Sequence, residues 1–182
     1  LITGRSRIVG VVLAHLDNLF YPRFLQLLTE GLQAQGMQVM LFLADGSREA
    51  GLMEQLLNYR VDGIVLAATT LNADLARACT EAGIPVVLFN RVPASAPDRA
   101  FHSVQTDQAA GVRALTEMLV AAGHQRIAYL AGSLESSTNQ ARELGCRQAL
   151  AAARMALYAY GVGNYEEALA RQVVLDWFLR DG

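Results

Sequence analysis

Polar and aromatic side chains gather directly after the apolar runs of this 182-residue chain. Asn18, Phe20 and Tyr21 follow the first run, and Asn90 and Arg91 follow the fourth. The later runs are followed by Asp107, Ser136, Thr138 and Arg142. Amides, hydroxyls and carboxylates exchange hydrogen bonds with ligand hydroxyls, and a guanidinium donates two parallel hydrogen bonds to a pair of oxygens. Together with the two aromatic rings, this set predicts a binding site for a small polyhydroxylated or heterocyclic ligand.

The acidic residues in these positions also have a structural interpretation. Asp17, Asp45 and Asp107 each stand where a turn or a helix begins, and Asp is a preferred helix N-cap. A cap needs only the backbone N–H groups of the next turn, whereas a ligand contact needs a site around the carboxylate. The sequence leaves both roles open for each of the three residues.

The residue pattern gives little support to catalysis. His15, His102 and His124 lie outside any nucleophile elbow of the Gly-x-Ser-x-Gly type. Residues 161–163, Gly-Val-Gly, begin like a dinucleotide fingerprint but lack its third glycine. No cluster of Cys and His has the spacing of a metal site. We therefore expect that the chain is not an enzyme and has no cofactor and no metal.

Short apolar runs alternate with segments of helical periodicity along the whole chain. The expected strands are residues 8–13, 39–43, 63–67, 85–89, 101–105, 127–131 and 157–162. The expected helices are residues 22–35, 48–59, 73–82, 107–122, 138–153 and 165–179. Continuous apolar runs indicate strands buried on both faces, and regular βα alternation predicts a parallel sheet with helices on both faces. In such α/β folds ligands bind at the carboxyl ends of the strands, where the polar set lies.

Proline and glycine mark the expected helix ends. Pro22 fits the first turn of a helix, where its missing N–H costs no hydrogen bond. Gly36, Gly83 and Gly123 each follow a helical segment, and glycine at this position predicts a left-handed residue that ends the helix.

Composition and charge exclude several classes of protein. The net charge is −2 with acidic and basic residues interleaved, so we expect no nucleic-acid surface on this chain. No apolar run reaches the roughly 18–20 residues of a membrane span, and the N-terminus lacks a signal peptide's apolar core. Cys79 and Cys146 are interpreted as reduced, packed thiols. These features predict a cytoplasmic protein without a membrane role.

Several short motifs, taken in order, resemble the lactose/galactose-repressor (LacI/GalR) family of transcription regulators. Residues 17–21, Asp-Asn-Leu-Phe-Tyr, are similar to its Asn-Pro-Phe-Tyr turn, with leucine in place of proline. The other resembling segments are residues 1–12, 60–67, 83–91, 106–111, 123–132 and 137–145. Each motif is weak alone, but their shared order and spacing make the set specific over about residues 1–154. The family often has an aromatic residue just after the strand near Tyr160, where this chain has Gly161-Val-Gly163 and then Tyr165.

The resemblance implies a periplasmic-binding-protein-like fold of two Rossmann-like subdomains with helices on both faces of each sheet. Residues 1–6 would end a linker from a missing DNA-binding head, residues 7–106 would form the N-terminal effector-binding subdomain, and residues 107–182 would form part of the C-terminal one. By position, the implied effector contacts are Asn18, Phe20, Tyr21, Arg91, Asp107, Thr138 and Arg142, with Ser136 and Asn90 as weaker candidates.

The function implied is that of a sensor domain in a repressor-type regulator. A small-molecule effector, a sugar or related metabolite, would bind in the cleft between the subdomains and control DNA binding by a helix-turn-helix. Operator DNA would be contacted through that separate N-terminal domain and not through this chain. The partners implied are the effector and a second copy in a homodimer.

Two alternatives belong to other classes. The first is a periplasmic solute-binding protein of a sugar ABC transporter, because one fold can host both functions. A helix-turn-helix ahead of residue 1 would favour the regulator, and a signal peptide there would favour transport. The second is a Rossmann-like enzyme, which needs a nucleotide loop or a convergent catalytic set that the sequence does not contain.

Overall fold

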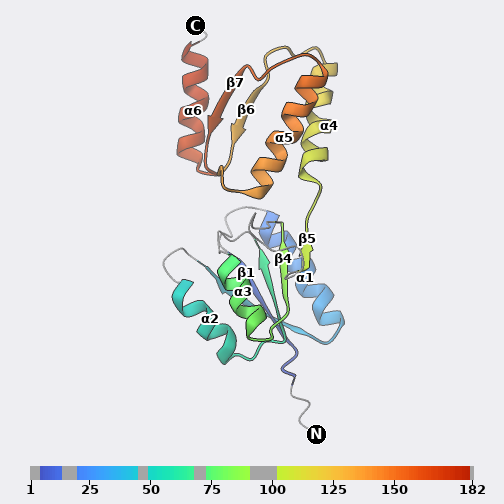
Figure 1. The fold of residues 1–182 in the computed structure, drawn as a ribbon, viewed down its shortest axis with the longest axis vertical. Helices are drawn as coiled ribbons and strands as arrows, with labels where there is room; N and C mark the ends of the chain where they lie inside the picture. The colour runs from blue at the N-terminus through green and yellow to red at the C-terminus, as the bar shows by residue number, and fades with distance from the viewer. Residues whose placement is uncertain (1–4, 14–19, 45–48, 68–72, 91–101, 181–182) are drawn as a thin grey trace. The chain divides into compact units, whose positions relative to one another are not determined.

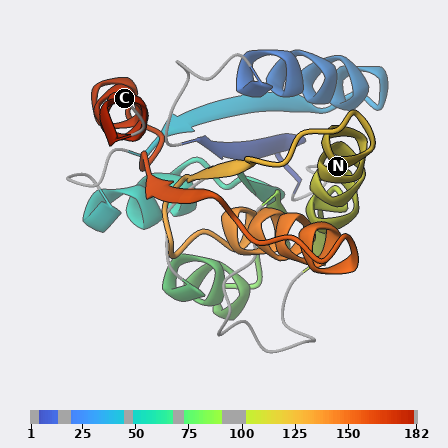
Figure 2. The same ribbon diagram turned by 90° about the horizontal axis from the view of Figure 1, so that it is seen from above.

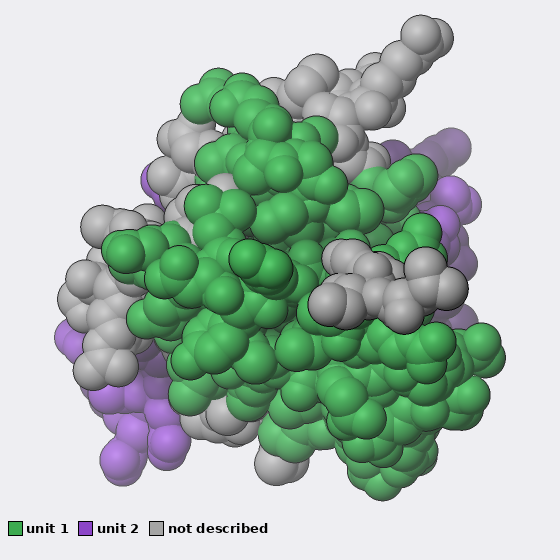
Figure 3. Space-filling view, turned by 90° about the horizontal axis from the view of Figure 1, so that it is seen from below, with its two compact units in different colours: residues 1–105 green, residues 106–182 purple. Residues whose placement is uncertain are grey.

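The computed structural model describes residues 5–13, 20–44, 49–67, 73–90 and 102–180. The chain divides into two compact units, residues 1–105 and residues 106–182, which Figure 3 distinguishes by colour. Each unit is described by itself below.

Unit 1 is built around a parallel sheet of five strands (Figure 1). Its elements, in chain order, are β1 (Ile8–Leu13), α1 (Phe20–Ala34), β2 (Gln38–Leu43), α2 (Glu49–Asn58), β3 (Gly63–Ala67), α3 (Ala73–Glu81), β4 (Val86–Phe89) and β5 (His102–Val104). The strand order is β2-β1-β3-β4-β5, and every neighbouring pair is parallel. The predicted α/β class with a parallel sheet is confirmed.

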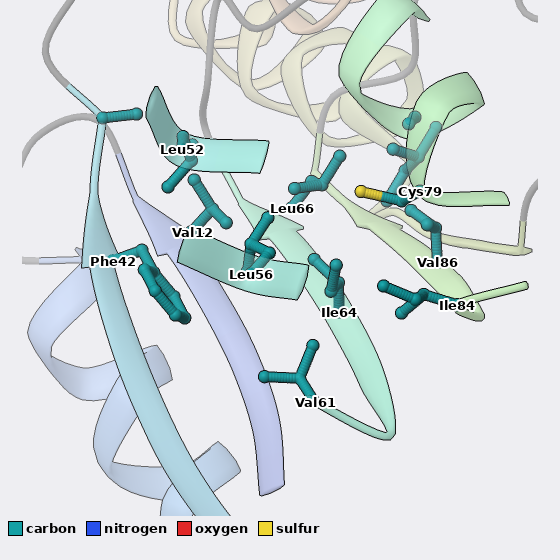
Figure 4. Packing of buried hydrophobic residues seen from close by; sticks show 13 residues of the cluster. Val12, Phe42, Leu52, Leu56, Val61, Ile64, Leu66, Cys79, Ile84 and Val86 are labelled. Atoms are coloured by element: carbon teal, nitrogen blue, oxygen red, sulfur yellow. The ribbon is translucent and has the colours of Figure 1, made fainter. Parts of the chain in front are cut away.

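The side chains of alternate residues of β1 pack into two apolar cores on opposite faces of this sheet. Val12 belongs to the core beneath α2 and α3, where it clusters with Leu56 and Ile64 (Figure 4). Val11 and Leu13 belong to the other core, which α1 covers. The view from above shows α1 on one side of the strands and α2 with α3 on the other (Figure 2). All three β1 side chains are fully buried, as the continuous apolar run predicted.

Unit 2 contains a two-stranded parallel sheet and three helices. Its elements are α4 (Gln108–Ala121), β6 (Ala128–Ala131), α5 (Ser137–Ala152), β7 (Ala159–Val162) and α6 (Glu167–Arg180). Adjacent residues of β7 face different helices: the Tyr160 hydroxyl reaches Glu143 of α5, whereas a Cβ on Gly161 would collide with Val173 and Trp177 of α6. Helices α5 and α6 therefore cover opposite faces of this sheet.

The predicted helix ends are largely confirmed. Gly36, Gly83 and Gly123 follow α1, α3 and α4 with φ of 73°, 76° and 87°, the left-handed conformation that glycine adopts without strain. Helix α1 begins at Phe20, two residues before the expected start, so Pro22 is its third residue. Pro22 still lies in the first turn, where backbone N–H groups have no intrahelical acceptor.

Asp62 holds the residues that precede β1. Its Oδ1 accepts hydrogen bonds from the backbone nitrogen and the hydroxyl of Ser6, and its Oδ2 accepts one from the backbone nitrogen of Arg7 at 2.9 Å. The Arg7 N–H bond is the largest cause of a lowered pKa at the Asp62 carboxyl, because it stabilises the charged form. The start of β1 is therefore attached through side-chain bonds to the loop before β3.

Two negative findings concern the described part of the chain. None of its helices has both the length and the apolar character needed to cross a bilayer. Cys79 and Cys146 are both buried and are not joined in a disulfide, in agreement with the prediction of packed thiols.

Candidate functional site

In unit 1, the aromatic candidate Phe20 lies at the carboxyl edge of the sheet. It is the first residue of α1, and its ring stacks on Phe89, the last residue of β4, with centroids 6.1 Å apart and planes 12° apart. Phe24 stacks on the same Phe89 ring at 3.9 Å. Phe20 remains 46% exposed, so its ring offers an open apolar surface against which a sugar or base can stack.

The other predicted ligand contacts of unit 1 differ in how exposed their side chains are and in whether the structure describes them. Tyr21 is only 6% exposed and belongs to the core under α1, where its ring and the Phe20 ring are nearly perpendicular, with centroids 5.2 Å apart. Its side chain is therefore packed rather than offered to a ligand. Asn90 has a left-handed backbone with φ of 65°, and its N–H donates to Val104. Asn18 and Arg91 lie outside the described residues.

In unit 2, Ser136 and Thr138 form the N-terminal cap of α5. The Ser136 hydroxyl accepts from the backbone nitrogen of Asn139 and lies 2.8 Å from the Thr138 hydroxyl. Both side chains are almost fully buried. Their first role is thus to satisfy the start of the helix and each other. They lie beside the positive end of the α5 dipole, a position that favours negatively charged groups.

Arg142 is half-buried, and a side chain of α4 holds it in place. Its Nε donates to Gln108 Oε1 at 2.6 Å, so the guanidinium is fixed across the two helices. The close approach depends on Gly145, where a Cβ would overlap the backbone carbonyl of Ala109. The Arg-x-x-Gly spacing therefore places the Arg142 guanidinium one turn before Gly145, the residue whose missing side chain lets α4 pack closely against α5.

Asp107 has the structural role that the sequence left open. Its Oδ1 accepts from the backbone nitrogen of Ala110 at 2.9 Å and caps α4, while the residue stays exposed. Thr106 and Gln108 share a hydrogen bond beside it.

A hollow of about 380 Å³ opens in unit 2 beside β6, within the roughly 300–1,000 Å³ of small-molecule pockets. Its apolar wall comes from α4, β6 and α5 and includes Leu115, Leu119, Ile127 and Cys146. Its polar groups come from α4, from β6 and the residue after it, from α5 and from the loop after β7: Thr116, Tyr129, the Gly132 backbone, Asn139, Arg142 and Tyr165. Of the predicted unit 2 residues, Arg142 alone lines this hollow; Ser136 and Thr138 lie next to its polar end.

Tyr165 is an aromatic residue that lies slightly later in the chain than the position, just after the strand near Tyr160, where the family often has one. It lines the hollow, and a Cβ on Gly132 would overlap its ring, so the ring lies directly against the Gly132 backbone. Its hydroxyl donates to Ser136 Oγ. Asn164 and Tyr165 both have positive φ, 50° and 62°, which is rare for a bulky side chain and places this ring at a cost in backbone strain.

Asn139 is the site residue that sequence reasoning missed. It is 3% exposed, and its Oδ1 accepts from the Gly132 N–H at 2.9 Å and from the Tyr129 hydroxyl at 3.3 Å. Burial, with a smaller contribution from Glu143, raises the pKa of Tyr129 to about 12, so this phenol keeps its proton and donates. The sequence signal was an amide in the first turn of α5, one residue after Thr138.

The family to which this fold belongs is decided by a match along most of the chain. The family model described as periplasmic binding proteins and sugar binding domain of LacI family matches residues 6–163. The chain belongs to this family. The predicted LacI/GalR-type effector-binding domain is thereby confirmed, as is the periplasmic-binding-protein-like fold.

Individual LacI-family proteins support the same assignment. The maltose regulon regulatory protein MalI of Escherichia coli K12 is 39% identical over 142 residues, which cover 76% of this chain and 41% of MalI. The regulator CelR of Thermobifida fusca is 29% identical over 180 residues, which cover 93% of this chain and 53% of CelR. The solved CelR–cellobiose complex superposes with a TM-score of 0.84 at 27% identity, covering 94% of this chain and 56% of that one.

These relatives are transcription regulators rather than enzymes or transport proteins. The chain spans about half the length of the curated relatives it matches.

Proposed function

We propose that this chain is the effector-sensing part of a LacI-type transcription regulator of the repressor kind. It binds a small-molecule effector, a sugar or related metabolite, and thereby controls DNA binding by a helix-turn-helix domain of the whole protein. It works in the cytoplasm as a homodimer, by binding rather than by catalysis.

The observation that carries this proposal is the family match over residues 6–163, because it extends across both compact units. The relatives add the ligand class. The CelR complex contains cellobiose, and a solved Cra regulator of Pseudomonas putida, with a TM-score of 0.81 at 25% identity and covering 97% of this chain and 65% of its own, is described with fructose 1-phosphate.

Each unit, taken by itself, offers a side chain that can contact a ligand. Unit 1 offers the half-exposed Phe20 ring, and unit 2 offers the fixed Arg142 guanidinium beside its hollow. We propose that the linker end is residues 1–6 and that residues 7–106 and 107–182 contribute one set of effector contacts each. The division into compact units after residue 105 supports these boundaries.

Regulation follows from differential affinity. A ligand shifts an equilibrium between two arrangements only if it binds one of them more tightly, and the coupling to DNA is reciprocal. An effector that tightens or weakens operator binding by the whole protein must therefore itself bind more tightly or more weakly when operator is present.

Thermal unfolding of the chain against glucose, fructose, maltose, cellobiose, glucose 6-phosphate, gluconate and fructose 1-phosphate tests the proposal. A true ligand at a hundred times its Kd raises the free energy of unfolding by about 2.7 kcal/mol. Sorbitol at equal concentration controls for solute effects that do not saturate. If none of the seven compounds gives a saturable shift, the sugar-sensing proposal fails.

The transporter alternative is less supported, because the curated relatives named above are regulators. Operator binding by the full-length protein separates the two functions. Effector-sensitive binding to one DNA sequence supports the regulator, whereas ligand binding with no DNA affinity at all supports transport.

A further inference from the structure

Ser6 and Arg7, the two residues that lead into β1, bind one carboxylate through their backbone N–H groups. The Ser6 N–H donates to Asp62 Oδ1 at 3.1 Å, and the Arg7 N–H donates to Asp62 Oδ2 at 2.9 Å. The Ser6 hydroxyl donates to Asp62 Oδ1 and accepts from the Ile8 N–H at 3.2 Å. Two adjacent N–H groups that hold an anion in this way resemble the backbone nests of other proteins. Ser6, Arg7 and Asp62 are called the entry clamp below.

Main-chain hydrogen bonds complete the entry clamp on both sides of β1. The Arg7 carbonyl accepts from the N–H of Gln38, the first residue of β2, at 2.8 Å. The Ile8 carbonyl accepts from the Asp62 N–H, also at 2.8 Å. Strands β2 and β3 flank β1 in the sheet, so the incoming chain is attached to the segments that begin both neighbours of β1.

The backbone of Arg7 has a conformation that its own side chain disfavours. Its φ is 58°, in the left-handed region that residues with a Cβ rarely adopt. Such a conformation persists only where the surrounding structure over-determines it, and it often marks a functional position. Here the Arg7 N–H is held by Asp62 and the Arg7 carbonyl by Gln38. The turn into β1 therefore depends on a carboxylate that lies 55 positions later in the sequence.

The entry clamp and the aromatic candidate Phe20 lie at opposite ends of the same sheet. The clamp precedes the amino end of β1, whereas Phe20 lies at the carboxyl edge. Between them, the side chains of Val11, Val12 and Leu13 are fully buried, and β1 is paired with β2 and β3 along its length. Because a close-packed interior resists deformation, a displacement of the carboxyl edge is transmitted to the clamp.

We propose that Asp62 is a positioning residue for regulation: by holding Ser6 and Arg7, it fixes the direction in which the chain ahead of residue 5 leaves unit 1. This inference rests on the proposed function, in which a helix-turn-helix domain of the whole protein responds to the effector. With the clamp closed, that domain follows the movements of unit 1. With the clamp open, it reaches its operator in any arrangement of unit 1, so effector and operator no longer influence each other's affinity.

Trypsin digestion of the chain tests whether Asp62 holds the entry. Trypsin cleaves after arginine, and a bond in a fixed turn must open locally before a protease cuts it. Asp62→Ala should accelerate cleavage after Arg7 about fivefold or more, because the bonds that hold the turn are lost. Glu81→Ala is the matched control, since it removes an exposed carboxylate of unit 1 that pairs with Arg77 on α3. Equal cleavage rates for the parent and Asp62→Ala would overturn the inference.

The full-length protein tests the consequence for regulation. The probes are a DNA duplex that the parent protein selects from a random-sequence pool and the sugar that raises its melting temperature. The coupling factor is the ratio of the Kd values of that sugar without and with the duplex. Asp62→Ala should leave the Kd without DNA unchanged and bring the coupling factor about fivefold or more towards one. Ser6→Ala keeps both backbone donors of the clamp and should have a smaller effect.

Val86→Ala separates this role from a general loss of stability. Val86 is 3% exposed in the core of unit 1 and lies outside the entry clamp, so the substitution lowers the melting temperature and leaves the clamp intact. If Asp62→Ala keeps the parent's coupling factor, or if Val86→Ala reduces it as much, the inference is wrong and the proposed function stands. If the parent binds no sugar or selects no DNA, the proposed function fails and the inference fails with it.

Discussion

The backbone of Gly145 on α5 lies against the carbonyl of Ala109 on α4, with no room between them for a Cβ. Replacing Gly145 with alanine must therefore push the two helices apart. We expect a loss of about 1–3 kcal/mol in the free energy of unfolding, the usual cost of overpacking. Urea denaturation followed by circular dichroism measures it.

Gly111 on α4 provides the matched control for that substitution. A Cβ there meets nothing within 4 Å, so Gly111→Ala should stabilise the helix by about 0.5–1 kcal/mol. Equal effects of the two substitutions would contradict the role given to the Gly145–Ala109 approach. Because the same approach carries Gln108 to Arg142, Gly145→Ala should also weaken effector binding.

Asp62 makes the stability depend on pH in the acid range. Its carboxyl has a lower pKa in the folded chain than the ordinary 3.8, so its contribution is fully present above that value and is lost as the pH falls through the folded pKa. Asp62→Asn should lower the melting temperature at pH 7, and the gap between variant and parent should narrow at pH 3. Ser6→Ala, which removes one of the three donors, should reproduce part of the gap at pH 7. A gap that is constant with pH would show that the carboxylate charge is not involved.

Arg154 ends α5 in the left-handed conformation that glycine adopts after three other helices. Its φ is 57°, whereas Gly36, Gly83 and Gly123 occupy the corresponding positions after α1, α3 and α4. A residue with a Cβ pays roughly 1–2 kcal/mol in this conformation. Arg154→Gly should therefore raise the melting temperature by about 2–8 °C, as scanning calorimetry can measure. Gly123→Arg should have the opposite sign, and a stabilising Gly123→Arg would refute the argument.

Phe20 should contribute to ligand affinity through its exposed face. Aromatic contacts are worth about 0.5–1.5 kcal/mol, so Phe20→Ala should weaken binding of the sugar identified by thermal shift about 2- to 10-fold. The matched control is Phe178→Ala, which removes a ring that is 74% exposed on α6. Titration calorimetry compares the two variants. An unchanged Kd for Phe20→Ala would show that Phe20 does not contribute to ligand binding.

Much of the candidate site was predictable because it depends on chain order. The carboxyl ends of parallel strands share one edge of a sheet, so polar residues after Phe89 and Ala131 were expected near ligand-binding positions. Arg142 was predicted in this way, and it lines the hollow of unit 2. Tyr21 and Thr138 were also placed near a site, but burial of their side chains depends on packing that their local sequence does not encode.

The sequence by itself determined the kind of elements and their alternation. Apolar runs gave the strands, helical periodicity gave the helices, and Gly36, Gly83 and Gly123 gave the helix ends, because these features depend on residues a few positions apart. Tertiary structure alone decided which distant side chains meet. Asn139 turns its oxygen to Gly132 and leaves its nitrogen unpaired, and Tyr165 lies over the Gly132 backbone, because α5 and the end of β7 pack against the end of β6. Such contacts follow from the packing of whole elements, which no local spacing of residues specifies.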